Sequence, residues 1–515
     1  LHAPTSGTIA AIGDHPIAHP SGLKAPCLIL EPDGQEQAVE PLSPLADYRA
    51  ADPGLIRRRV REAGVVGLGG AAFPTAVKLN PGPSQKVGLL VLNGAECEPY
   101  ITCDDLLMRE RAREIVGGLL IMIHALQVRE AIIGVEDNKP EARQALAEAL
   151  EGIRAEGVRL QTVPTIYPAG GEKQLIKVLT GREIPAHGIP AEIGIVCQNV
   201  GTAAAVYRAV LEGQPLISRY LTVTGQGVSH PGVLEVPIGT PVAHLVEQCG
   251  GYTDKAVRLV MGGPMMGFAL GNDQVPVVKG SNCIWVAARE ELAPNVPSLP
   301  CIRCGACVEA CPASLLPQQL YWYAKAKDFD KTQDYNLFDC IECGCCSAVC
   351  PSHLPLVQYY RFAKTEIWAQ ERDRRKADLA RQRFEARQER LEREKAEKAE
   401  KLAKKKAAVK KDQAGDGQDP KKAAIEAALA RAKARKAEAQ AVEKAGEPGQ
   451  PEEAMAGPPR PAEPVVLPEQ QRLLEAAQGK RPEQQKIPAA KANHRTEAAA
   501  TQGDAAASTG DKGED

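Results

Sequence analysis

Two short cysteine motifs constrain the fold of this chain more than any other feature. Residues 301–312 read CIRCGACVEACP and residues 340–351 read CIECGCCSAVCP. Both have the spacing C-x2-C-x2-C-x3-C-P, in which three thiolates bind one iron–sulfur cubane and the fourth binds its neighbour. Two copies therefore predict a module with two 4Fe-4S clusters. We expect the metal to supply much of its cohesion, because little continuous apolar sequence surrounds the motifs.

The same spacing predicts which cysteines share a cluster. One set is Cys301, Cys304, Cys307 and Cys350, and the other is Cys340, Cys343, Cys346 and Cys311. Gly305 and Gly344 leave room for backbone N–H groups to approach the cluster sulfurs. Cys345 has no place in this count and is interpreted as a bystander, and the six scattered cysteines as small buried hydrophobes. The alternative is a pair of zinc ribbons, which usually separate two C-x2-C pairs by a longer loop.

Aromatic residues divide the chain into a folded part and a tail. Between residues 369 and 515 the only aromatic residue is Phe384, and none of the 15 cysteines lies there. We therefore expect packed cores only in about the first 365 residues. Residues 370–411 have a helical pattern with 17 Lys and Arg against 9 Asp and Glu, a net charge of +8. The sequence after Asp412 predicts disorder, because it is poor in large apolar side chains.

The remaining general features exclude some classes of protein. The longest apolar run, residues 115–123, is shorter than the roughly twenty residues that span a bilayer. Tightly grouped cysteines favour a reducing compartment, the cytoplasm. The total charge of −2 gives no indication of a nucleic-acid partner. The chain begins with Leu, directly before the strand-like run HAPTSGTIAAI, so we expect a truncated or processed N-terminus.

Patterning predicts five regions. Residues 1–45 read as short strands, part of a small β module. Residues 46–215 alternate helices with apolar strand segments at 87–92, 131–135, 158–163 and 193–197, which indicates an α/β domain with a parallel sheet. Residues 216–290 read as a small α+β module, with strands near 220–224, 232–236 and 257–261 and a helix near 241–249. The cluster module occupies 291–365, and 366–515 form a charged helix and a disordered tail.

A glycine-rich loop opens the α/β domain, with the sequence GLGGAAFPTAVKL at residues 67–79. Gly67, Gly69 and Gly70 allow a phosphate to approach the backbone, Pro74 is placed to begin a helix, and Lys78 adds positive charge. A purely structural turn is the alternative, because no strand immediately precedes the loop.

Two further segments follow predicted strands. NGAECEP, residues 93–99, places Glu96 and Glu98 where parallel sheets bind ligands, although solvated charges are the alternative. YPAGGEKQL, residues 167–175, follows the predicted strand at 158–163 and contains Tyr167 and Glu172.

These three segments resemble the FMN- and NADH-binding elements of the flavoprotein subunit of respiratory complex I. VTGQGVSHPGVLEVPIGTPV, residues 223–242, resembles the soluble-ligand-binding β-grasp (SLBB) module of that family. The order of modules, with two ferredoxin-type motifs and a Lys/Ala-rich tail, is similar to the family of C subunits of Rnf ion-translocating electron transport complexes. That family begins with a lipoyl-like barrel-sandwich hybrid, which the opening residues fit in part.

The resemblance implies a multidomain α/β fold and a set of cofactor-binding residues. FMN contacts would come from Gly67, Gly69, Gly70, Lys78 and Asn93, and the flavin and nicotinamide site would be shaped by Glu96, Glu98, Tyr167 and Glu172. Asn199 and Thr202, in QNVGT, match another flavin-side segment. Phe73 is a candidate for stacking on a ring, with burial under the loop as the alternative. Leu68 and Ala95 stand where complex I flavoproteins carry Arg and Asp, departures that concern nucleotide affinity.

The implied function is electron input, by an NADH-linked oxidoreductase subunit, to an ion-translocating membrane complex. Electrons would pass between NADH, FMN and two 4Fe-4S clusters. The partners would be integral membrane and ferredoxin-like subunits, with ferredoxin or flavodoxin as carrier, at the cytoplasmic face of the bacterial inner membrane. Alternatives are a microcompartment cobalamin reductase, a diaphorase subunit of a soluble hydrogenase or formate dehydrogenase, and a flavin-free relay scaffold. The basic segment would lie along anionic lipids or partner subunits, or be a solvated helix.

Overall fold

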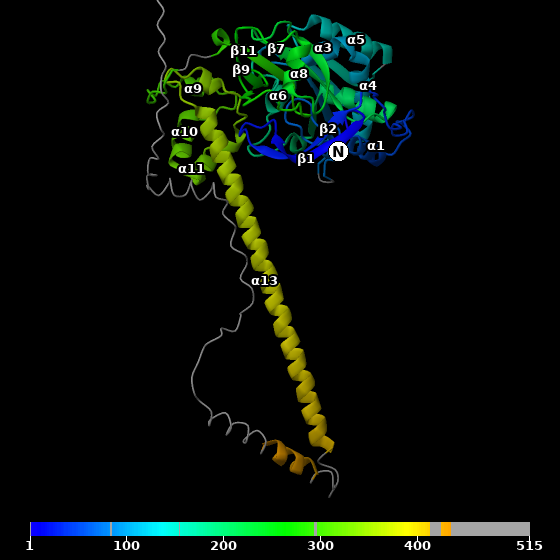
Figure 1. Cartoon of the computed structure of the whole chain (residues 1–515), viewed down its shortest axis with the longest axis vertical. Coiled ribbons are helices and arrows are strands. Elements are labelled where there is room, and N and C mark those ends of the chain that lie inside the picture. Colours follow the sequence, from blue (N-terminus) through cyan, green and yellow to red (C-terminus); the bar gives the residue numbers. More distant parts are fainter. Residues whose placement is uncertain (1, 83–84, 154, 293–295, 413–423, 434–515) are drawn as a thin grey trace, which may run out of the picture. The chain divides into compact units, whose positions relative to one another are not determined.

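A computed structural model describes residues 2–82, 85–153, 155–292, 296–412 and 424–433 (Figure 1). The chain divides into two units, Leu1–Arg393 and Glu394–Asp515. The first unit contains the sheets and both cysteine motifs, and the second contains only helix among its described residues.

A four-stranded parallel sheet forms the centre of the α/β domain. Its strands lie in the order β5 (Val158–Val163), β4 (Glu130–Glu136), β3 (Leu89–Gly94) and β6 (Ile195–Asn199). The bounds lie within two residues of the four predicted strand segments. The chain adds β4 and β5 on one side of β3 and then returns to place β6 on the other. Such a reversal opens a ligand-binding crevice at the carboxyl ends of β3 and β6, the strands on either side of the reversal.

Helices cover both faces of this sheet. One face packs on α1 (Pro53–Glu62), α3 (Cys103–Glu110), α4 (Ala112–Leu126), α5 (Pro140–Ile153) and α7 (Val200–Tyr207). The other face packs on α6 (Glu172–Thr180) through Leu175, Ile176 and Leu179. Gly118 allows helices α4 and α7 to approach closely, since a Cβ at this position would collide with the carbonyl oxygen of Ala203.

The next module is a mixed five-stranded sheet, ordered β10, β9, β11, β7, β8. Its elements are β7 (Ser218–Thr224), β8 (Gly232–Pro237), α8 (Val242–Gln248), β9 (Ala256–Met261), β10 (Phe268–Ala269) and β11 (Cys283–Ala288). The three strands and the helix predicted for this region are present, whereas β10 and β11 were not predicted. Every residue of β11 is buried, so this strand lacks the alternation that marks a half-exposed strand.

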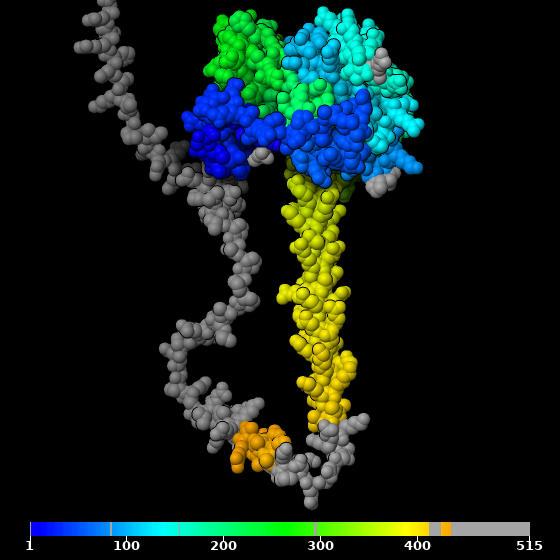
Figure 2. All heavy atoms as spheres, turned by 90° about the vertical axis from the view of Figure 1, so that its right-hand side faces the viewer, coloured from blue at the N-terminus to red at the C-terminus, as the bar shows by residue number. Residues whose placement is uncertain are grey.

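An antiparallel hairpin of β1 (Gly7–Pro16) and β2 (Lys24–Pro32) begins the chain. It agrees with the short strands predicted there. Ile9, Ile12 and Leu28 are exposed on it, whereas Ala18 packs against the core of the five-stranded module. In the space-filling view, the dark blue hairpin residues lie beside the green residues of that module (Figure 2).

The cysteine module has a small apolar core, which was not predicted from the sequence. Its helices are α9 (Ala306–Glu309), α10 (Pro317–Ala326), α11 (Phe329–Asp334), α12 (Cys345–Ala348) and the first turns of α13 (Leu356–Asp412). Leu320, Leu337 and Tyr360 are fully or almost fully buried in this core. The Tyr360 hydroxyl donates a hydrogen bond of 2.6 Å to the carbonyl oxygen of Pro317. Metal is therefore not the only source of cohesion in the module.

The remaining elements are short helices. They are α2 (Thr75–Lys78), η1 (Pro190–Ile193), η2 (Arg208–Glu212), η3 (Arg289–Glu291) and η4 (Leu337–Asp339). Among the described residues, no helix is long and apolar enough to cross a membrane.

The predicted charged helix is confirmed as α13, which begins before the basic segment and ends at Asp412. Ion pairs one turn apart, such as Arg375 with Glu371 and Lys404 with Glu400, stabilise its exposed surface. Residues 424–433 are also helical, which contradicts the disorder predicted after Asp412 for that segment. Its Ala, Leu, Arg and Lys residues are strong helix formers. The rest of the predicted disordered tail lies outside the described residues.

Candidate functional site

Two cavities in the cysteine module contain the two predicted sets of thiols. The larger, about 320 Å³, is lined by Cys301, Cys304, Cys307 and Cys350. The smaller is lined by Cys311, Cys340, Cys343 and Cys346. Each cavity therefore takes its fourth cysteine from the other motif, whereas Cys345 lines neither of them. Four soft thiol ligands around one space fit an iron–sulfur cluster.

The spacing of these thiols argues against a single zinc ion. Four sulfurs bound to one zinc at about 2.3 Å lie about 3.8 Å apart in a tetrahedron. In the described part of the chain, only Glu96, Cys103 and Asp104 bring three potential metal-binding atoms within 4.8 Å of one another. Within each cysteine set the sulfur atoms are more widely spaced than this, as a cubane bound by the four thiols of that set requires.

The backbone repeats in the two motifs. Arg303 and Glu342 have φ of 57° and 58°, and Gly305 and Gly344 have φ of 86° and 83°. These left-handed residues curl each loop around its cavity, and the N–H of Arg303 approaches Cys301 Sγ at 3.4 Å. The loop shape therefore fits a cluster whose sulfurs accept backbone hydrogen bonds.

The glycine-rich loop lies next to Asn199, at the carboxyl end of β6, and buried side chains fix its backbone through hydrogen bonds. The Leu68 N–H donates to Thr202 Oγ1 at 2.9 Å, and the Leu68 carbonyl accepts from Arg219 Nη2 at 2.8 Å. Thr202 and Arg219 are buried, whereas Gly69 and Gly70 are exposed. The glycines thus present an open backbone surface. Arg219 was not among the predicted site residues, because it belongs to β7 of the next module.

Lys78 and Glu172, predicted from separate segments, meet beside this loop. Lys78 Nζ donates to Glu172 Oε1 at 2.8 Å and to the carbonyl oxygen of Cys197 at 3.2 Å. Both side chains remain about one-third exposed, so the ammonium group is positioned and still accessible to an anion. Phe73 is 47% exposed, which contradicts the alternative that this ring is buried under the loop.

Two predicted asparagines fix the surrounding backbone. Asn93 donates from Nδ2 to the Gly170 carbonyl at 2.7 Å and accepts at Oδ1 from the Ala95 N–H at 3.0 Å. Asn199 caps α7 by accepting from the Gly201 N–H at 2.8 Å. Asn93 thus ties together the loops that follow β3 and β5, and Asn199 fixes the start of α7.

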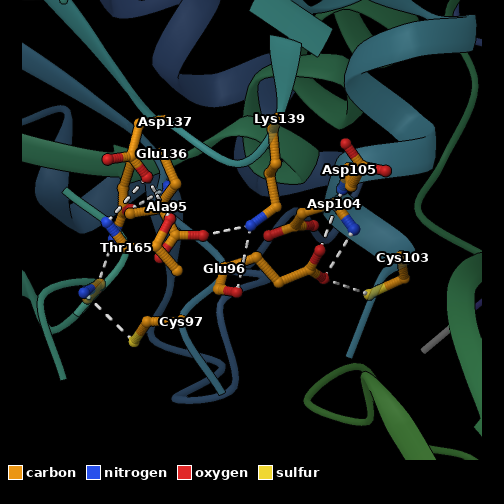
Figure 3. A network of polar contacts seen from close by, with 12 residues as sticks. Ala95, Glu96, Cys97, Cys103, Asp104, Asp105, Glu136, Asp137, Lys139 and Thr165 are labelled. Carbon is orange, nitrogen blue, oxygen red and sulfur yellow. Dashed lines mark hydrogen bonds and ion pairs between the residues drawn. The ribbon is translucent and has the colours of Figure 1, made fainter. Parts of the chain in front are cut away.

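Glu96 is the centre of a partly buried polar network (Figure 3). Its two carboxylate oxygens accept the N–H groups of Asp104 and Asp105 at 2.9 and 3.0 Å, at the N-terminus of α3. Lys139 Nζ donates to the Glu96 carbonyl oxygen at 3.3 Å and forms an ion pair with Glu136. Burial, and then the nearby Asp104, raise the pKa of Glu96 to about 8. This carboxyl group therefore holds a helix in place.

The network also reaches the glycine-rich loop. Asp104 Oδ2 accepts from Asn199 Nδ2 at 2.6 Å, and a Cβ on Gly69 would lie 3.5 Å from Asn199 Cβ. The Asn199 side chain thus connects Asp104 to Gly69, so a substitution of Asp104 would alter the position of a residue that contacts the loop. Asp104 and Lys139 were not predicted from the sequence, since neither has a motif of its own.

Glu98 and Tyr167 join the α/β domain to its neighbours. Glu98 Oε1 accepts the N–H groups of Met265 and Met266, at 2.8 and 3.0 Å, from the five-stranded module. The Tyr167 hydroxyl donates to the carbonyl oxygen of Cys343 at 2.6 Å. An ion pair of 3.0 Å between Lys173 and Asp339 supports the same contact. The loops after β3 and β5 therefore link this domain to the five-stranded module and to the second cysteine motif.

Three family models match the chain. The Nuo51 FMN-binding domain matches residues 60–208, the SLBB domain matches residues 220–269, and the 4Fe-4S dicluster domain matches residues 300–354. These matches confirm the kinds of domain that the motifs predicted.

Curated relatives cover most of the chain. A Pseudomonas aeruginosa protein, named as the C subunit of an ion-translocating oxidoreductase complex, is 52% identical over 76% of this chain and 50% of the relative. Proteins of the same name from Yersinia pseudotuberculosis and Serratia proteamaculans are each 48% identical, over 80% and 85% of this chain and 58% and 60% of their own length. The chain thus spans little more than half the length of these relatives.

Among solved structures, the chain is similar to one in the NAD+-reducing [NiFe]-hydrogenase in the H2-reduced state. The identity is 19%, the match covers 62% of this chain and 63% of that one, and the TM-score is 0.44. The curated relatives are much nearer in sequence, and they agree with the resemblance carried by the motifs. Over most of its length the chain is thus homologous to C subunits of ion-translocating oxidoreductase complexes.

Proposed function

We propose that the chain is the electron-input subunit of an ion-translocating oxidoreductase complex, acting between NADH, FMN and two 4Fe-4S clusters. The observation that carries this proposal is the hydrogen bond from Tyr167 to Cys343, which joins the FMN-type domain to the second cysteine motif. When bound, FMN would supply the conversion between a two-electron donor and one-electron carriers. The chain itself contributes position and charge.

The predicted flavin-site residues divide into two roles. Gly67, Gly69, Gly70, Phe73 and Lys78 offer backbone, an exposed ring and a positive charge to a ligand with a phosphate group. The others bind the chain itself and position the loops; they are Asn93, Glu96, Glu98, Tyr167, Glu172, Asn199 and Thr202.

The thiols lining the two cavities would hold the clusters. Cys340, Cys343 and Cys346, with Cys311 from the first motif, lie in the part of the cysteine module that contacts the α/β domain. We infer that their cluster is the one next to the flavin. The cluster of Cys301, Cys304, Cys307 and Cys350 would then be the farther one.

The finer assignments belong to this proposal as well. Residues 1–45 would be part of a barrel-sandwich hybrid, 46–215 the FMN and NADH domain, 216–290 a β-grasp, 291–365 the two-cluster domain and 366–515 the tail. The partners would be integral membrane and ferredoxin-like subunits, with ferredoxin or flavodoxin as carrier. The chain would lie at the cytoplasmic face of the inner membrane, where basic side chains of α13 favour anionic lipids by about 1 kcal/mol each.

Anaerobic reconstitution tests the proposal. Protein loaded with iron, sulfide and FMN should show bleaching of the flavin and reduction of the clusters when NADH is added. Lys78→Ala should bind FMN more weakly, whereas Lys24→Ala, in the N-terminal hairpin, should not. Cluster-loaded protein that binds FMN but is not reduced by NADH would exclude the NADH role. An acid extract without flavin, after expression with its complex, would instead favour the relay scaffold.

A further inference from the structure

The two cysteine motifs present equivalent edges to their surroundings. Residues 302–305 read Ile-Arg-Cys-Gly, and residues 341–344 read Ile-Glu-Cys-Gly, with matching left-handed backbone at the second and fourth positions. The edge at 341–344 and the edge at 302–305 therefore have the same shape, and they differ in sequence only at Arg303 and Glu342.

The edge at 341–344 is covered by the rest of the chain. Tyr167 donates to the Cys343 carbonyl at 2.6 Å, and a Cβ on Gly344 would lie 3.1 Å from the Met265 carbonyl oxygen. Glu342 pairs with Arg361 at 2.9 Å and with Lys364 at 2.8 Å. This edge is thus used as an internal docking surface: its carbonyl contacts the α/β domain and its glycine contacts the five-stranded module, while its charge is paired within the cysteine module.

The edge at 302–305 is bare. Ile302 is 68% exposed, Arg303 and Cys304 are exposed, and a Cβ on Gly305 would meet no atom within 4 Å. In the part of the chain that the structure describes, no carboxylate forms an ion pair with Arg303. Trp322 lies on the rim of the same cavity, 43% exposed, with the Lys325 ammonium 5.7 Å from its ring centroid. This surface therefore combines the apolar side chains of Ile302 and Trp322 with the positive charges of Arg303 and Lys325.

We propose that the edge at 302–305 docks an acidic electron-carrier protein, in the way that the edge at 341–344 docks the α/β domain. A partner carboxylate would pair with Arg303, apolar side chains would cover Ile302 and Trp322, and a donor would bind the carbonyl of Cys304. One electron would pass between the cluster of the Cys301 set and the partner's redox centre. One centre is oxidised, the other is reduced, and no covalent bond changes. This inference rests on the proposed function.

Arg303→Glu tests this directly, because Glu342 shows that glutamate fits this left-handed position. The full chain with reconstituted clusters is reduced with dithionite, and its reoxidation by excess acidic two-cluster ferredoxin is followed by stopped flow. We expect the second-order rate constant to fall on the order of tenfold, and to lose most of its dependence on salt, because attraction speeds the encounter of charged proteins. Arg58→Glu, at an exposed position of α1, should behave like the unmodified chain.

Iron and sulfide are measured in every sample. If Arg303→Glu loses its clusters, Lys325→Glu on α10 carries the same test without altering a cluster-binding loop. Rates and salt dependence unchanged in the cluster-loaded variant would overturn the proposal. The result is distinguishable from failure of the proposed function, because dithionite replaces NADH here. Flavin bleaching by NADH, measured separately, reports on that function alone.

Discussion

The Tyr167 hydroxyl donates a hydrogen bond of 2.6 Å to the carbonyl oxygen of Cys343, although 176 residues separate the two in sequence. Burial and nearby acidic groups raise the pKa of Tyr167, so the phenol keeps its proton as a donor. The contact connects a loop of the FMN-type domain to the edge of a cysteine motif. Each side of this interface offers a substitution that tests it.

Tyr167→Phe removes this hydrogen bond and keeps the ring. Because the Cys343 carbonyl would lose a partner at an interface, we expect a loss of about 1 kcal/mol in the free energy of unfolding. Reduction of the clusters by NADH should also slow. Urea denaturation and stopped-flow spectroscopy measure the two effects. Tyr252→Phe, whose exposed hydroxyl binds Asp273 at 3.2 Å, is the control and should leave the NADH reaction unchanged.

Gly344→Ala and Gly305→Ala form a matched pair, since both glycines have a left-handed φ. Each alanine should cost about 1–2 kcal/mol of stability from backbone strain. Only the alanine at 344 also meets the Met265 carbonyl oxygen, at 3.1 Å. We therefore expect Gly344→Ala to be the less stable variant in thermal melts, with slower reduction of the clusters by NADH. Equal losses in the two variants would show that the contact with Met265 is unimportant.

Glu96 makes stability depend on pH. In the folded chain the Glu96 carboxyl group has a pKa of about 8, whereas in the unfolded chain it releases its proton near pH 4.5. The folded state therefore binds more protons between these values, and this group's contribution makes the free energy of unfolding fall as pH rises through that range. Glu96→Gln should flatten the dependence in urea titrations. Glu151→Gln, on the exposed side of α5, should retain it.

Cysteine substitutions separate the ligands from the bystander. Cys343→Ser should lose iron from its site, because Cys343 lines the smaller cavity, whereas Cys345 lines neither cavity. We expect Cys345→Ser to retain about eight iron atoms per chain, four for each cubane. Iron and acid-labile sulfide analysis after anaerobic reconstitution measures both. Loss of iron from Cys345→Ser would make Cys345 a ligand.

Local pattern was sufficient for the cysteine sets and for most strands. The thiols of one motif lie within 12 residues, so covalent geometry limits how they can be arranged, and the strands β3 and β4 carry nearly continuous apolar sequence. Local pattern failed for β11, because a strand that is buried throughout shows no alternation. It also failed for residues 424–433, because the prediction of disorder rested on the scarcity of large apolar residues and not on the helix-forming side chains.

The sequence by itself determined the two cluster motifs, the glycine-rich loop and the order of the modules, because each depends on residues close together in the chain. Only the tertiary structure decided that Arg219 holds Leu68, that Glu96 caps α3, and that one cysteine motif is covered while the other is bare. The edges at 302–305 and 341–344 differ at one residue and share the same left-handed backbone positions. Their difference arises from what packs against them, and such contacts join residues that no local pattern connects.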